Sequence, residues 1–349
     1  MLEACRRLPR PPRFVFSSTT AVFGGPLPDV VSENVAVLPQ SSYGAEKAIA
    51  EYLLNELDAP VTDPLPIVDT HQHLWDLTRF TLPWHKGENT TPLRRSFVMS
   101  DYLEATQGLN VVKTVYMEVD VAPAQQMAEA DYVIEICGRG DTPMKAAVIS
   151  GRPGTPGFEP YIRTLAQSTY IKGVRQVLHG DSDPPGFCLQ PAFVESIQLL
   201  GELGLSFDLC LRPGEVLGAV ALVDQCPKTR FILDHCGNMS VTSTDHAARA
   251  RWLEGMTEMA ARANTVCKVS GIVVTASTNW RPGDLAPNIN DTIDTFGDDR
   301  VMFASDWPVC TLKASFSQWV NALREIVKDR PAEFQRKLFH DNASKFYGI

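Results

Sequence analysis

Short apolar runs alternate along most of the chain with longer stretches in which apolar residues recur every three or four positions. The runs are typical of buried parallel strands, and the longer stretches are typical of amphipathic helices. Strands are predicted at residues 65–69, 111–119, 145–150, 171–177, 205–211, 230–234, 266–270 and 301–304. Helices are predicted at residues 124–137, 191–203, 213–225, 247–263, 313–329 and 331–346. This alternation predicts an α/β fold, and eight strands favour a TIM-like (β/α)₈ barrel over an open sheet.

The pattern changes near residue 60. Residues 58–64 contain two prolines and no periodic pattern of apolar residues, which indicates a linker. Before it, the sequence predicts a strand at residues 13–17, a loop and a helix at residues 42–57. Such a short strand-loop-helix extension cannot bury a core of its own, because a domain needs two packed layers. We therefore divide the chain into an N-terminal segment, residues 1–60, and a barrel, residues 61–349.

Composition narrows the class of protein. With 32 Lys and Arg against 41 Asp and Glu, the chain of 349 residues carries a net charge of −9, which disfavours a nucleic-acid partner. No apolar stretch reaches the roughly 20 residues of a membrane span. The eight cysteines are too sparse for a disulfide scaffold, which favours a reducing compartment. We expect a cytoplasmic protein that binds a small molecule and has no membrane partner. The sequence does not decide whether the chain forms a homo-oligomer.

Histidines and carboxylates stand at the ends of several predicted strands, where barrel enzymes place their chemistry. His71 and His73 are two positions apart, so they share one face of an extended chain and can reach one ion together. Asp234 and His235 follow the sixth strand, and Asp306 follows the eighth. Neutral imidazoles with a carboxylate suit Zn²⁺. Other polar residues at strand ends are Glu118, Asp120, Arg175 and His179.

Each of these features also has an ordinary explanation. A His-x-His pair occurs by chance, Asp234 and His235 can satisfy backbone groups at a turn, and Glu118 can pair with a nearby lysine. The same residue types at three separate strand ends nevertheless favour a site.

The motifs resemble those of the amidohydrolase superfamily, in the branch of the sugar lactonases and pyrone-dicarboxylate lactonase. The resemblance spans residues 64–349 and rests on His71-Gln-His73-Leu-Trp75, Gly173-Val-Arg175, Leu233-Asp-His235-Cys-Gly237, Val269-Ser270-Gly271 and Asp306-Trp-Pro308.

This resemblance implies a hydrolase in which Asp306 activates water and His235 and Arg175 assist. The metal ligands that it implies are His71, His73, His235 and Asp306, with Glu118 as a tentative addition. The substrate contacts that it implies are Arg175, which would hold a carboxylate or hydroxyl, His179 and Trp75. No lysine or histidine pair matches the residues that bridge two metals in many amidohydrolases. We therefore expect one divalent ion, Zn²⁺ first, with metal-independent catalysis left open.

We interpret the chain as a hydrolase of carbohydrate metabolism that opens a lactone, foremost of a sugar acid. The first alternative is a metal-dependent non-oxidative decarboxylase of the same superfamily. The second is an NAD-dependent oxidoreductase carried by the N-terminal segment, and the third is a catalytically silent barrel that serves as a binding module.

The N-terminal segment resembles a different family, the extended short-chain dehydrogenases and epimerases, over residues 13–57. Thr19, Tyr43 and Lys47 match the catalytic residues of that family. Tyr43 and Lys47 are four apart on one predicted helix, so the ammonium can lower the pKa of the phenol. The glycine-rich half that binds the cofactor has no match, and we expect residues 1–60 to be a remnant without function.

Overall fold

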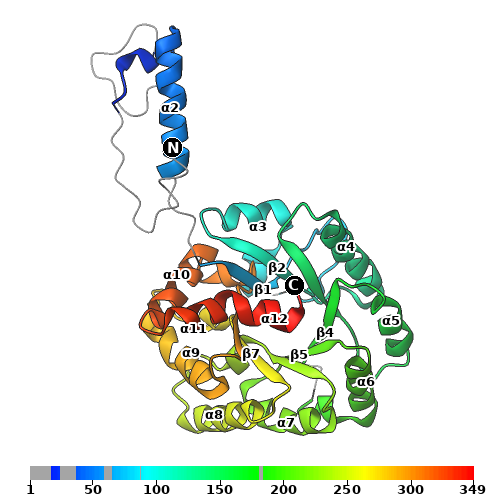
Figure 1. Cartoon of the computed structure of the whole chain (residues 1–349). Coiled ribbons are helices and arrows are strands. Elements are labelled where there is room, and N and C mark those ends of the chain that lie inside the picture. Colours follow the sequence, from blue (N-terminus) through cyan, green and yellow to red (C-terminus); the bar gives the residue numbers. More distant parts are fainter. Residues whose placement is uncertain (1–16, 24–36, 59–64, 87, 181–183) are drawn as a thin grey trace. The chain divides into compact units, whose positions relative to one another are not determined.

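The computed structural model describes residues 17–23, 37–58, 65–86, 88–180 and 184–349 (Figure 1). The chain divides into two compact units, Met1–Pro64 and Leu65–Ile349. In the first unit, a short 3₁₀ turn, η1 (Thr20–Val22), precedes helix α2 (Ser42–Asp58), which lies where a helix was predicted. The strand predicted at residues 13–17 lies outside the described residues, apart from Ser17.

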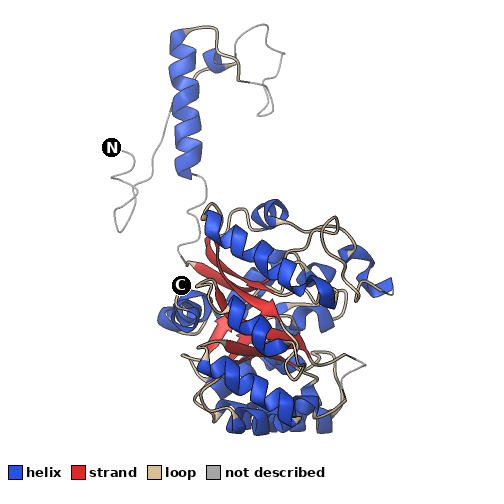
Figure 2. Ribbon diagram, turned by 90° about the vertical axis from the view of Figure 1, so that its right-hand side faces the viewer, coloured by secondary structure: helices blue, strands red, loops and turns tan. Residues whose placement is uncertain are grey.

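The second unit contains one sheet of eight parallel strands in sequential order, surrounded by helices (Figure 2). The strands are β1 (Ile67–Gln72), β2 (Val111–Met117), β3 (Met144–Ser150), β4 (Ile171–Val177), β5 (Ser206–Cys210), β6 (Arg230–Leu233), β7 (Thr265–Val269) and β8 (Val301–Phe303). The sheet curls so that β1 meets β8, where the Thr70 hydroxyl donates to the Phe303 carbonyl at 2.8 Å. All eight predicted strands are present, and the barrel prediction is confirmed.

The helices of this unit lie outside the strands. They are α3 (Met99–Ala105), α4 (Gln126–Arg139), α5 (Phe158–Leu165), α6 (Pro191–Glu202), α7 (Val216–Gln225), α8 (His246–Ala260), α9 (Pro282–Phe296), α10 (Phe316–Val327), α11 (Ala332–Arg336) and α12 (Asn342–Tyr347). The helix predicted at residues 331–346 is present as an unbroken helical stretch, in which a π-helical turn, Lys337–Asp341, links α11 to α12. The wide turn precedes Asn342, whose side-chain amide donates to the carbonyls of Asp298 and Val301.

One end of the barrel is closed by apolar packing. Ala343 and Tyr347 of α12 pack with interior residues that include Val68, Val115 and Met302, and α12 lies across the barrel opening (Figure 1). The polar strand ends are therefore left at the opposite, carboxyl end. No helix among the described residues combines the length and the apolar character that a membrane crossing needs. The cysteines of the described part are all free and buried.

Candidate active site

The first and last strands are fixed to each other by Asp69, a buried residue of β1. Its carboxylate accepts hydrogen bonds from the backbone N–H of Ser305 at 2.8 Å and from the Ser305 hydroxyl at 2.6 Å. The backbone N–H of His73 also donates to the Trp307 carbonyl at 2.8 Å. These bonds bring His71, near the end of β1, and His73, just after it, next to Asp306 after β8.

The backbone is strained where the strands end. Asp306, His235 and Asp120 have φ angles of 57°, 54° and 49°, in the left-handed region that residues other than glycine seldom adopt. They follow β8, β6 and β2. Strain of this kind concentrates at functional sites, where the surrounding structure holds it in place.

The side chains of His73 and Asp306 lie close enough to hold a cation or a proton between them. Nδ1 of His73 lies 3.0 Å from the Met117 carbonyl, which can only accept, so Nδ1 carries the hydrogen. In the neutral ring, Nε2 then presents a lone pair to Oδ1 of Asp306 at 3.3 Å. Nε2 of His71 lies 3.7 Å from the same oxygen.

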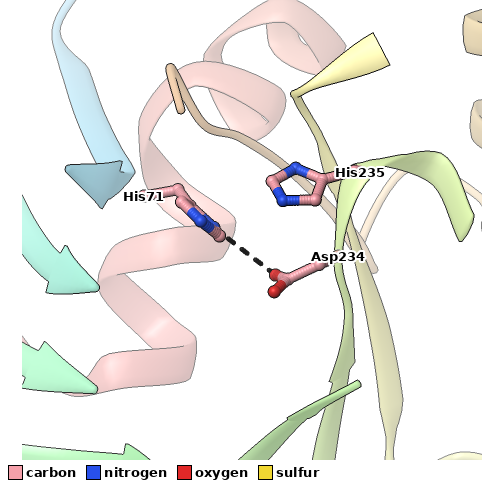
Figure 3. A group of neighbouring side chains, drawn as sticks. All are labelled: His71, Asp234 and His235. Carbon is pink, nitrogen blue, oxygen red and sulfur yellow. Dashed lines mark ion pairs between the residues drawn. The ribbon is translucent and has the colours of Figure 1, made fainter. Parts of the chain in front are cut away.

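His71 is oriented by its two neighbours. Its Nε2 accepts from a terminal nitrogen of Arg175 at 3.1 Å, so its Nδ1 carries the hydrogen and faces Asp234 at 3.5 Å (Figure 3). Burial lowers the pKa of His71 well below its usual value, against the opposing effect of Asp234. The ring is therefore neutral near pH 7.

Arg175 is held by a carboxylate of its own. Its Nε donates to Oε1 of Glu118 at 2.7 Å, and a terminal nitrogen donates to the Glu118 carbonyl at 2.9 Å. Burial opposes the charge on the guanidinium, but Glu118 outweighs it and the pKa of Arg175 rises. Glu118, a tentative ligand in the sequence analysis, lies outside the two groups of residues that could hold a metal. Its place is that of counter-ion to Arg175.

A buried lysine that the sequence analysis did not single out completes the network. Nζ of Lys268 on β7 lies 2.5 Å from Oδ2 of Asp208 on β5 and 3.3 Å from Oδ1 of Asp234. Burial raises the pKa of Asp234, but Lys268 and His71 outweigh it and lower that pKa well below its usual value. A signal was present, because a lone lysine within a buried, otherwise apolar strand needs a partner.

The Ser270-Gly271 motif after β7 shapes the position of His235. The Ser270 hydroxyl lies 2.9 Å from Nδ1 of His235. Gly271 has φ of 65°, and a Cβ at this position would overlap the imidazole of His235. The ring of His235 lies 4.6 Å from that of His71, centroid to centroid.

Two groups of donors could hold one divalent ion. They are His71, His73 and Asp306, and His71, Asp234 and His235, with donor atoms within 4.8 Å of one another. The first group fits better, because Nε2 of His73 and Oδ1 of Asp306 both present lone pairs to the space between them, whereas Lys268 already lies 3.3 Å from Asp234. To join this group, Nε2 of His71 would exchange its hydrogen bond from Arg175 for the ion. Imidazole nitrogens with a carboxylate are a donor set that Zn²⁺ accepts.

Four of the site residues, His73, Arg175, His235 and Asp306, line a cavity of about 410 Å³, within the usual size of a ligand pocket. Its walls are largely apolar and include Val119, Val177, Ile272, Val274 and Val309. Trp75 and Trp84 line it as well, but their indole N–H groups donate to the carbonyls of Arg95 and Val119 and so are already satisfied. His179 and Asn238 also border the cavity.

The three dehydrogenase-like residues lie in the first unit. The Lys47 ammonium donates to the Ser17 carbonyl at 2.7 Å and lies 5.9 Å from the centre of the Tyr43 ring. The Thr19 hydroxyl accepts from the backbone N–H of Ala21 at 3.3 Å. Tyr43 is 56% exposed, so its phenol stands in solvent rather than in a substrate cleft.

Known proteins resemble the second unit over nearly its whole length. The model of the family described as Amidohydrolase matches residues 68–349. L-fucono-1,5-lactonase of Burkholderia multivorans is 26% identical over 294 residues, covering 81% of this chain and 96% of that protein. L-rhamnono-gamma-lactonase of Scheffersomyces stipitis is 25% identical over 338 residues, covering 81% and 98%. The fold matches an amidohydrolase from Burkholderia multivorans crystallised with bound zinc, with a TM-score of 0.72, 23% identity and coverage of 81% and 99%.

The first unit resembles a different enzyme over a short stretch. D-erythronate dehydrogenase of Cupriavidus necator is 54% identical over 56 residues, which are 16% of this chain and 17% of that dehydrogenase. The match agrees with the predicted resemblance to dehydrogenases, and it covers only a small part of such an enzyme.

Proposed function

This chain belongs to the amidohydrolase family, and from that premise we propose that it hydrolyses the lactone of a sugar acid to the open-chain acid. The observation that carries the proposal is the position of Asp306 against the imidazoles of His71 and His73, in a cavity that the buried guanidinium of Arg175 also lines. The names of the two lactonase relatives support a sugar-acid lactone as the substrate class.

In the proposed reaction, Asp306 is the general base. It takes a proton from water as the water oxygen attacks the lactone carbonyl carbon, and it returns the proton to the ring oxygen when the ester C–O bond breaks. Arg175 and His235 face the same cavity and are placed to donate to the carbonyl oxygen as negative charge develops there. His71 is a positioning residue in this scheme, since it contacts both Arg175 and Asp306.

We propose that His71, His73 and Asp306 hold one divalent ion, Zn²⁺ first. When bound, such an ion supplies Lewis-acid assistance to the carbonyl. His73 suits this role because its Nδ1–H is fixed by the Met117 carbonyl, which directs the Nε2 lone pair toward Asp306.

The test is hydrolysis of a panel of aldonolactones, followed with a pH indicator, on protein of known metal content and on a chelated sample. Acid release that chelation abolishes and Zn²⁺ restores supports both the lactonase and the metal site. Acid release that survives chelation supports the lactonase, assigns His73 to a substrate contact and leaves His71 as a positioning residue. No acid release from any lactone overturns the proposal and favours the decarboxylase, which CO₂ release from aromatic acids would then test.

A further inference from the structure

We infer that this site takes an uncharged lactone and selects against a substrate with a carboxylate of its own, with Asp120 as the specificity-determining residue. The inference rests on the proposed lactone hydrolysis and deepens it. It also revises the expectation that Arg175 holds a substrate carboxylate.

The described residues that line the cavity offer no free positive charge. Among the described residues that line it, Arg175 is the one guanidinium or ammonium group, and it is only 5% exposed. Glu118 takes two of its N–H groups, and its other terminal nitrogen faces His71 at 3.1 Å and Asp234 at 3.7 Å. A donor can remain for a neutral carbonyl or hydroxyl, but the charge is already compensated.

The arginine and lysine side chains near the cavity are likewise paired with carboxylates. Arg175 pairs with Glu118, and Lys268 pairs with Asp208. Arg152 pairs with Asp120. Lys268 also lies 3.3 Å from Asp234, so one ammonium serves two carboxylates, and Asp306 has no lysine or arginine partner among the described residues. These carboxylates leave an excess of negative charge that one divalent ion would offset, so with or without metal no positive charge of the described residues remains for a substrate carboxylate.

Asp120 adds a negative group to the wall of the cavity. Its backbone N–H donates to Oε2 of Glu118 at 2.6 Å, and this bond holds the residue after β2 at its positive φ. One carboxylate oxygen contacts Arg152, and the side chain is 38% exposed. The other oxygen is therefore positioned to accept from a substrate hydroxyl, and it would repel a substrate anion.

The apolar walls of the cavity also disfavour a substrate that carries a carboxylate. A carboxylate that leaves water for a surface of Val177, Ile272 and Val274 loses hydration and finds no donor there to replace it. The C–H faces of a neutral lactone ring suit that surface. A dicarboxylic pyrone and the lactone of an aldaric acid are therefore poor substrates for this site.

The experiment compares two lactones of the same ring, an aldonolactone and the aldarolactone that differs by a terminal carboxylate. We expect wild-type kcat/KM to be at least ~10²-fold higher for the neutral compound, because an unpaired like charge disfavours the other. Asp120→Asn should narrow this ratio at least ~10-fold, chiefly by a gain on the charged lactone, since it frees Arg152. Asn tolerates the left-handed φ. Asp131→Asn, an equal charge change at an exposed position of α4, should leave the ratio unchanged.

The outcomes separate the inference from the proposed function. Equal or faster hydrolysis of the aldarolactone by the wild type overturns the inference and leaves the lactonase in place, and so does an unchanged ratio in a folded Asp120→Asn protein. If neither lactone is hydrolysed, the proposed function fails. Calorimetric binding of the same two compounds then decides the inference, because tighter binding of the charged ring overturns it and tighter binding of the neutral ring supports it.

Discussion

Asp306 owes its position to a small set of hydrogen bonds rather than to its own motif. The carboxylate of Asp69 ties β1 to Ser305, next to Asp306 in the chain, and the His73 backbone binds the Trp307 carbonyl. Oδ1 of Asp306 consequently lies 3.3 Å and 3.7 Å from the two histidine Nε2 atoms. The carboxylate can therefore act as a base at a fixed point in the cavity.

Asp306→Asn should lower kcat at least ~10²-fold, the scale of a positioned acid–base group, because the amide cannot take the proton from water. The measurement is steady-state hydrolysis of the best aldonolactone. Unchanged thermal unfolding would show that the loss is chemical, and Asp131→Asn is the matched control on an exposed position. Near-wild-type turnover in Asp306→Asn would remove this residue from the proposed mechanism.

Gly271→Ala tests whether the position of His235 matters. The added Cβ would overlap the imidazole, and an alanine at φ of 65° is strained by about 1–2 kcal/mol. We expect kcat to fall by about 10-fold to 10²-fold, since small misplacements of catalytic groups cost that much. Gly283→Ala in α9 is the control, because its Cβ would meet nothing within 4 Å and activity should persist. Equal activities of the two variants would contradict the role given to His235.

At the residue scale, the sequence predicted which polar residues follow the strands but not how they pair. His71, His73 and Asp306 were visible because chain order alone places them at strand ends. The partners of Arg175 and Lys268 depend on which side chains meet across the barrel interior, and that follows from strand register rather than from local pattern. Glu118 was therefore weighed as a metal ligand, and Lys268 was not considered.

At the scale of elements, strands were easier to predict than helices. The buried parallel strands read as continuous apolar runs, and all eight were found within a few residues of their ends. Helices α3 and α5 were not predicted, because seven and eight residues show too few turns for a helical period. Helix α9 was also missed, since Pro287 interrupts its pattern. None of these three helices supplies a residue of the proposed site.

Helix α4 carries a buried carboxyl group that should make stability depend on pH. Oε1 of Glu129 accepts from the Tyr116 hydroxyl at 2.9 Å and from the Val119 N–H at 2.8 Å. Burial, reinforced by the charge of Glu118, raises the pKa of Glu129 from 4.5 to about 7. Between these values the folded protein retains a proton that the unfolded chain has lost. This contribution to stability is therefore complete below pH 4.5 and is lost as pH rises through about 7.

Glu129→Gln should flatten that dependence, because the amide still accepts both hydrogen bonds and does not ionise. The measurement is the thermal midpoint of wild type and variant from about pH 5 to pH 8, with the wild type declining more steeply toward the alkaline end. Glu135→Gln, at an exposed position of the same helix, should follow the wild type. Parallel curves for wild type and Glu129→Gln would show that Glu129 is already ionised in the folded protein.

At the scale of the whole molecule, the described apolar clusters and the proposed site both lie within the barrel. Its two apolar clusters draw only on residues from 65 onward, among the residues that the structure describes. Every residue of the proposed site lies in the same unit, Leu65–Ile349. We propose that residues 1–60 are a dehydrogenase-like remnant, since Tyr43 stands in solvent and the match to D-erythronate dehydrogenase covers 17% of that enzyme.

Deletion of residues 1–60 should therefore leave lactone hydrolysis and the thermal midpoint of the barrel unchanged, because neither apolar cluster of the barrel loses a described residue. The full chain should show no saturable binding of a nicotinamide dinucleotide in calorimetry, since the described residues of the first unit contain a 3₁₀ turn and one helix but no glycine-rich βαβ unit that could hold the cofactor. Tyr43→Phe in the full chain is the control and should change neither result. Lost hydrolysis after the deletion would give residues 1–60 a part in the barrel's function. Nicotinamide binding that Tyr43→Phe weakens would mean that the segment still works as part of an oxidoreductase site.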